Sequence, residues 1–127
     1  MRNYQRQKNN PYILPDELYK RMRDLICDYE RMKKERADIL CSYAHSDELP
    51  HSGIGNPTER KALKLVVLDR ECEAVDNALR IVPEEYRAAL LDNIRNHSPY
   101  PYTAHRNTYG YWKSKLIYTL AKNLNYI

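Results

Sequence analysis

Between residues 103 and 122 the sequence gathers side chains that can hydrogen-bond to bases and phosphates. They are Thr103, His105, Arg106, Asn107, Thr108, Tyr111, Lys113, Ser114, Lys115 and Lys122. Arginine can donate two hydrogen bonds to guanine, and asparagine can bond adenine in a similar bidentate way. Lysine, serine, threonine and tyrosine donate to phosphate oxygens. The combination is typical of a helix that reads DNA, and the simpler interpretation is a surface helix with ordinary lysines.

Charge is distributed unevenly along the chain, and both ends lack acidic residues. Residues 1–15 carry Arg2, Arg6 and Lys8 without an acid, whereas the middle of the chain has a net charge of −4. Residues 93–127 have a net charge of +5 and contain no carboxylate side chain. Because nearby acids would cancel the attraction to phosphate, the C-terminal stretch favours binding to nucleic acid.

A helix from about Thr103 or His105 to Asn123 would position these side chains. Apolar residues recur along it in steps of three and four, which gives a helix one buried face. These residues are Tyr109, Trp112, Leu116, Ile117, Leu120 and Leu124. At about 100° per residue, Lys113 falls near this apolar side. The opposite face is predicted to carry Asn107, Tyr111, Ser114, Lys115, Tyr118 and Lys122.

A shorter helix is predicted just before this one. Pro83, Glu84 and Glu85 suit a helix start, because proline fits the first turn and acids interact well with the helix dipole. The segment His-Ser-Pro-Tyr-Pro at 97–101 ends it. Helix-turn-helix proteins place the second helix of such a pair in the major groove. Residues 82–127 are therefore predicted to form a helix-turn-helix-like DNA-binding part.

Two long helices are predicted within residues 15–81. The first begins at Pro15 and Asp16, and the second begins at Asn56-Pro57-Thr58-Glu59, which combines a cap, a proline and an acid. The first apolar stripe is Leu18, Met22, Leu25, Tyr29, Met32, Ile39 and Tyr43, with Arg36 at one apolar position. The second is Leu65, Leu68, Cys72, Val75, Leu79 and Val82. Such stripes suit an antiparallel hairpin and equally suit a seam between two chains, so a homodimer stays open.

The whole chain is thus predicted to be all-α: an N-terminal arm at 1–14 and one helical domain at 15–127. No apolar run approaches the roughly 18 residues that a membrane-spanning helix needs. We expect no secretory signal, because no apolar stretch follows the basic start. Three widely spaced cysteines, Cys27, Cys41 and Cys72, indicate free thiols in a reducing compartment. These features favour a cytoplasmic protein without membrane partners.

Catalytic and metal-binding chemistry finds little support in the sequence. Cys41, His45 and His51 could suggest a zinc site, but their spacing matches no standard zinc motif and no fourth ligand is near in the sequence. Neither a glycine-rich phosphate loop nor a zincin motif is present. We therefore expect a protein that is not an enzyme and needs no cofactor or metal.

A series of short stretches follows in a fixed order along residues 12–127. They are Tyr12-Ile13-Leu14-Pro15, Asp28-Tyr29-Glu30-Arg31-Met32-Lys33, Asn56-Pro57-Thr58, Val82-Pro83-Glu84-Glu85-Tyr86-Arg87, His105-Arg106-Asn107-Thr108-Tyr109, Trp112-Lys113, Ile117-Tyr118, Ala121-Lys122 and Leu124. In these stretches the chain resembles the RinA-like phage transcriptional activators. The resemblance implies DNA binding and activation of phage late genes by a helix-turn-helix similar to sigma-factor region 4. Arg106, Asn107 and Thr108 would then begin the recognition helix. The turn departs from that pattern, because residues 97–102 contain two prolines in place of a glycine turn.

Two hypotheses from different classes follow. The first is a sequence-specific regulator of phage or prophage genes that binds double-stranded promoter DNA in the bacterial host, where host RNA polymerase is a further candidate partner. The second is a non-enzymatic phage protein that acts through its long helix pair, such as a packaging small subunit or an inhibitor of a host protein. A gel shift and the size of the assembly distinguish them.

Overall fold

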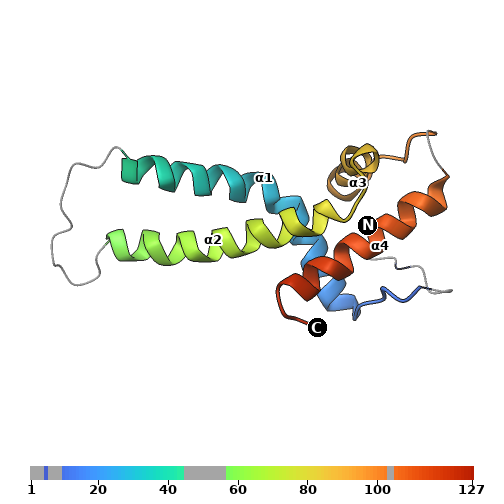
Figure 1. Cartoon of the computed structure of the whole chain (residues 1–127), viewed down its shortest axis with the longest axis horizontal. Coiled ribbons are helices and arrows are strands. Elements are labelled where there is room, and N and C mark those ends of the chain that lie inside the picture. Colours follow the sequence, from blue (N-terminus) through green and yellow to red (C-terminus); the bar gives the residue numbers. More distant parts are fainter. Residues whose placement is uncertain (1–4, 6–9, 45–56, 103–104) are drawn as a thin grey trace.

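The computed structural model describes Gln5 and residues 10–44, 57–102 and 105–127. Within them lie four helices and no strand, which confirms the all-helical class (Figure 1). The helices are α1 (Asp16–Ala44), α2 (Pro57–Arg80), α3 (Glu84–Asn96) and α4 (Arg106–Asn123). Among the described residues, no helix combines the length and the apolar character that crossing a bilayer requires.

α1 and α2 run antiparallel along most of their length (Figure 1). Lys61 near the start of α2 approaches Ser42 near the end of α1, with 3.4 Å between Nζ and Oγ. Arg36, the one charged residue in the first apolar stripe, contacts Asp69 of α2 at 2.6 Å. The ion pair explains how a cation is accommodated between two helices whose other facing residues are largely apolar.

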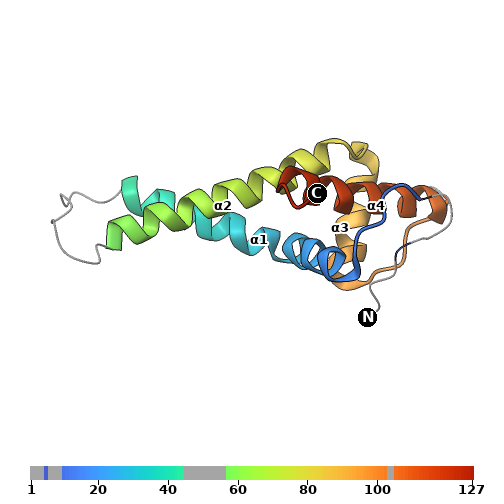
Figure 2. The same cartoon turned by 90° about the horizontal axis from the view of Figure 1, so that it is seen from below.

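Beyond this paired region, α3 and α4 pack around the first half of α1 and the second half of α2 (Figure 2). The core there is formed by fully buried side chains from all four helices, including Ile26, Val75, Leu90, Ile94, Leu116, Ile117 and Leu120. The first half of α1 is covered on more than one side, so Tyr19 and Ile26 are buried although neither belongs to the predicted stripe. A single apolar stripe is expected for a helix that packs on one neighbouring helix, whereas α1 packs on three helices.

The break between α3 and α4 is set by local chemistry. His97 caps α3 in the left-handed region, with φ of 57°, and its amide bonds to the Asn93 carbonyl oxygen. Asn93 also donates from Nδ2 to the Ser98 carbonyl oxygen at 2.8 Å. Proline cannot continue a helix, so Pro99 and Pro101 carry the chain away from α3 before α4 begins.

Candidate nucleic-acid interface

The start of α4 offers a positive helix end without an acid to offset it. His105 is the N-cap, and its Nδ1 accepts a hydrogen bond from the Asn107 amide at 3.1 Å. No acidic residue occurs in the first turn of α4, so the dipole at this end is not compensated from within the helix. Backbone N–H groups at such helix ends can bind phosphate. The exposed Asn107 side chain lies at the same end.

The other predicted site residues near the start of α4 are only partly placed. Thr103 lies outside the described residues. Arg106 provides the first backbone unit of α4, and its side chain is also outside the description. Thr108 and Ser114 are half-buried on α4.

An aromatic stack anchors the start of α4 to the rest of the fold. Tyr109 is almost fully buried, and its ring stacks on Tyr100 with 4.8 Å between centroids and 8° between planes. Tyr86 of α3 meets the same ring edge-on at 5.3 Å. Burial raises the pKa of Tyr100 to about 12, so its phenol stays neutral near neutral pH. The stack fixes α4 against both α3 and the segment that connects them.

Aromatic rings gather around one lysine on the side of α4 that Tyr12 contacts, and all of them except Tyr111 are half-buried. We call Tyr12, Tyr111, Trp112 and Tyr118 the aromatic cluster. The Tyr12 ring lies 5.9 Å from Tyr111 and 5.4 Å from Tyr118, and both pairs are edge-to-face. The ammonium of Lys115 lies 5.3 Å from the Trp112 centroid. At this distance a cation is attracted to the face of the ring, so Lys115 is oriented at the surface of α4.

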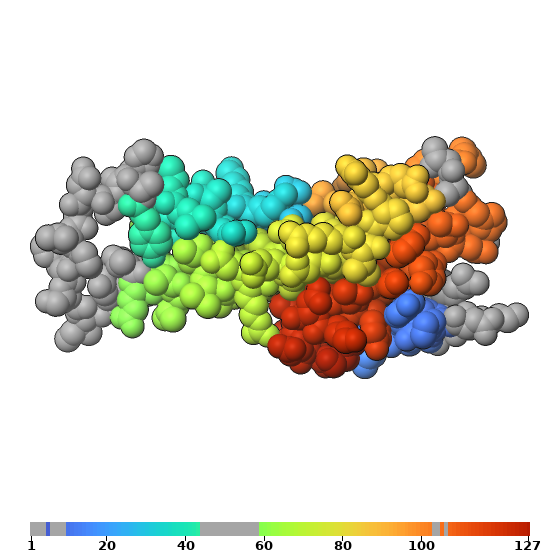
Figure 3. Space-filling view, in the orientation of Figure 1, coloured from blue at the N-terminus to red at the C-terminus, as the bar shows by residue number. Residues whose placement is uncertain are grey.

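Tyr12 therefore lies on the face of α4 that the sequence assigned to DNA. Figure 3 shows the blue N-terminal residues against the orange and red α4. Gln5 is buried and makes two hydrogen bonds to the backbone of Leu14: its Nε2 donates to the carbonyl oxygen and its Oε1 accepts from the amide, both at 2.7 Å. Leu14 itself belongs to the core. The sequence predicted a polar arm at 1–14, and Leu14 was the apolar signal that the end of this arm packs, whereas the neighbouring Ile13 is exposed.

Lys113 and Lys122 have different surroundings, although both were predicted to face DNA. Lys113 is half-buried and donates from Nζ to Oδ1 of Asn93 at 3.0 Å. Burial lowers the pKa of Lys113, and the charge of Arg23 lowers it further. Lys122 is exposed in the last turn of α4. Lys113 is thus turned toward α3, as its position near the apolar side of the helical wheel suggested.

Acidic side chains from elsewhere in the fold restrict the basic surface. Arg95 belongs to the acid-free stretch, yet it pairs with Glu30 of α1 at 3.2 Å. A groove on the α3 side of Tyr109 is lined by Glu85 and Asp92. A phosphate backbone is repelled from that groove, so the flank of α4 that carries Lys115 and Lys122 is the favourable side for nucleic acid. Sequence reasoning missed the Glu30 contact because it joins residues far apart in the chain.

No family model, no curated protein and no solved structure matches this chain. Among the described residues, no group of three histidine, cysteine or carboxylate side chains could hold a metal ion. His45 and His51, two of the three candidate ligands considered above, lie outside those residues. The three cysteines are free thiols, and only Cys72 is buried.

Proposed function

We propose that this protein is a sequence-specific double-stranded DNA-binding regulator of transcription. One observation carries the proposal: Tyr12, from the acid-free N-terminal stretch, packs on α4, which belongs to the acid-free C-terminal stretch. Tyr12 of the first stretch contacts Tyr111 and Tyr118 of the second. Together the two stretches hold eight basic residues and no acid. α4 lies within the acid-free C-terminal stretch, so no carboxylate from its own segment cancels the attraction of its basic residues to a phosphate backbone.

The proposed binding mode uses both parts of the interface. The first turn of α4 enters the major groove, where Arg106 and Asn107 contact base edges. Lys115 and Lys122 contact phosphates along the same helix, and Lys113 does not. Tyr12 packs on Tyr111 and Tyr118 of α4, so we include it in the surface that is proposed to meet the duplex. Its basic residues Arg2, Arg6 and Lys8 lie outside the described residues.

The regulated genes are proposed from the resemblance to RinA-like activators, which implies control of phage or prophage late genes. A binding site within the promoter region of such genes is the expectation. Specific regulators typically bind their sites about 10³–10⁷ times more tightly than random DNA. A protein that binds all duplexes equally would fit the basic surface and would not fit this function.

The test is a fluorescence anisotropy titration with duplexes that tile the protein's own genomic neighbourhood, at two salt concentrations. One duplex should bind more tightly than the rest, with an affinity that falls as salt rises. The double variant Arg106→Ala with Asn107→Ala should erase that preference and leave the helical circular dichroism spectrum unchanged. The matched control is Lys20→Ala with Asn77→Ala, which replaces exposed residues of the same kind on α1 and α2.

Two results would contradict the proposal in different ways. Binding that is absent at low salt removes the DNA-binding function itself. Binding whose sequence preference survives the double variant removes only the assignment of α4 as the recognition helix.

A further inference from the structure

One face of α2 is apolar and uncovered. Leu63, Val66 and Val67 are 64%, 65% and 54% exposed, and they lie within five consecutive positions. Single exposed apolar residues are ordinary on protein surfaces. Three such residues on adjoining positions of one helix form a patch, and patches of this kind commonly mark an interaction site. None of the three belongs to the apolar stripe that packs on α1.

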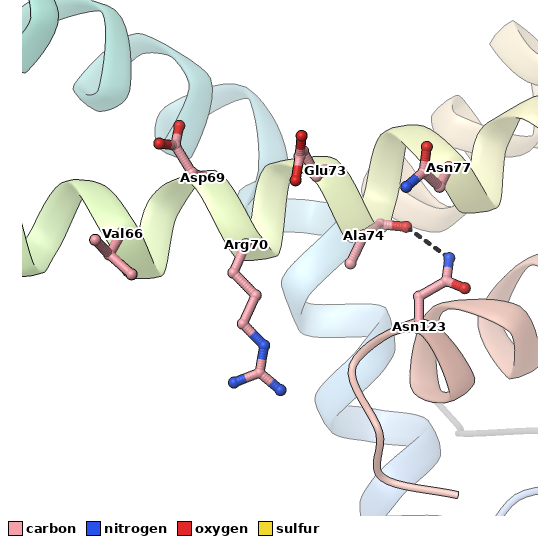
Figure 4. Close-up of a pocket in the computed structure, with 7 residues that line it drawn as sticks. All are labelled: Val66, Asp69, Arg70, Glu73, Ala74, Asn77 and Asn123. Carbon is pink, nitrogen blue, oxygen red and sulfur yellow. Dashed lines mark hydrogen bonds between the residues drawn. The ribbon is translucent and has the colours of Figure 1, made fainter.

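The fold explains why this face remains open. Further along the same side of α2, Ala74 and Ala78 are buried, and Asn123 at the end of α4 donates from Nδ2 to the Ala74 carbonyl oxygen at 3.1 Å. α4 ends at Asn123, so it does not reach the first half of α2. Figure 4 shows Val66 and Arg70 projecting from one side of α2 and Asp69 from the other. The open face is therefore the continuation of a face that α4 covers elsewhere.

Charge at the two ends of this face indicates its partner. Glu59, Leu63, Val66 and Arg70 follow one another at intervals of four, three and four residues, which places them on one side of the helix. We call these four residues the α2 stripe. Glu59 and Arg70 are both exposed, so the apolar centre of the stripe has an acid at one end and a base at the other. Arg70 donates from Nη2 to the Leu124 carbonyl oxygen at 2.9 Å, which is a neutral acceptor and leaves the charge of the guanidinium uncompensated.

We propose that the α2 stripe is the interface with a second copy of this chain, paired antiparallel about a two-fold axis. That arrangement sets Leu63 against Val66 of the partner subunit and Glu59 against Arg70 of the partner subunit, and each contact occurs twice. Parallel pairing would set each charge against its own copy and is disfavoured. The charge pattern thus selects both the kind of partner and its direction.

The length of the stripe limits the strength of the pairing. At 1.5 Å per residue the stripe covers roughly 17 Å of helix. The surface area that so short a stripe can bury is well below the roughly 1,200–2,000 Å² of a standard stable interface. We therefore expect a weak dimer that dissociates on dilution in the micromolar range. This proposal does not depend on the DNA-binding function, because none of the four stripe residues belongs to the surface of α4 that is proposed to contact DNA.

The experiment is sedimentation velocity on the full chain without DNA, from about 1 µM to about 1 mM, the range over which a weak dimer dissociates. Leu63→Glu should raise the dissociation constant at least about tenfold. Leu40→Glu is the matched control, because Leu40 is an exposed leucine on α1, outside the stripe. Both leucines are solvent-exposed, and circular dichroism verifies that each variant is folded.

A charge exchange tests the direction of pairing. Glu59→Arg should weaken the dimer, and combining it with Arg70→Glu should restore it, because the two opposite charges again face each other. A chain that is monomeric throughout the concentration range would overturn the proposal, as would an assembly larger than a dimer. A dimer that survives Leu63→Glu, or one that Leu40→Glu weakens equally, would also overturn it.

Discussion

The contrast between Lys113 and Lys122 yields a prediction about the salt dependence of DNA binding. Both lysines belong to α4, but Lys113 bonds to Asn93 at 3.0 Å whereas Lys122 is exposed. Each phosphate contact contributes about −0.9 to the slope of log K against log salt concentration. Lys122→Gln should therefore make the slope less steep by about one, and Lys113→Gln should leave it unchanged.

The size of this difference is well within reach of an anisotropy titration. Raising salt from about 50 to 200 mM costs roughly 3.5-fold in affinity for each phosphate contact. The Lys122→Gln variant should lose correspondingly less affinity over that range than the wild-type protein. The two variants carry the same substitution on the same helix, so each controls for the other, and a thermal melt checks that Lys113→Gln remains folded. Equal changes of slope, or a larger change for Lys113→Gln, would refute the conclusion that Lys113 is turned toward α3 and away from the DNA.

Two further predictions concern stability. Tyr109→Ala should lower the free energy of unfolding by about 3–5 kcal/mol in chemical denaturation, because it leaves a cavity beside Tyr100; Tyr109→Phe, which keeps the ring, should cost only about 1 kcal/mol. Burial and the hydrogen bond to Asp76 raise the pKa of Tyr29 well above its ordinary value. Since the unfolded phenol then ionises at lower pH than the folded one, stability should fall as pH rises above about 10, the ordinary tyrosine pKa. In Tyr29→Phe that fall should be smaller, and an unchanged pH profile of unfolding would contradict the reasoning.

The features that the sequence predicted well are those decided by neighbouring residues. The start of α2 at Pro57, the start of α3 at Glu84 and the end of α4 at Asn123 match the expected positions. Proline, helix-start acids and apolar spacing act within one or two turns, so they can be recognised in a single chain. Even the inward placement of Lys113 was visible as a conflict on the helical wheel, because the wheel reports only the geometry of one helix.

The features that sequence reasoning did not find depend on contacts between distant segments. Tyr12 rests on α4 and Glu30 pairs with Arg95, although each contact joins residues far apart in the chain. No local pattern identifies such partners, because the pairing depends on how whole helices pack. For the same reason, the apolar stripe of α1 gave no indication that Ile26 would be buried by neighbours other than α2.

α1 is one uninterrupted helix that contacts α2, α3 and α4. Its 29 residues correspond to roughly 43 Å, so it spans both the exposed half of α2 and the end of the molecule that carries α4. A continuous helix has no hinge between those two regions. If both proposals hold, a dimer joined through α2 would keep its two α4 helices at a fixed separation, because α2 itself packs on α4 and α1 braces both. The spacing of the two proposed DNA half-sites would then be set by the lengths of these rigid helices.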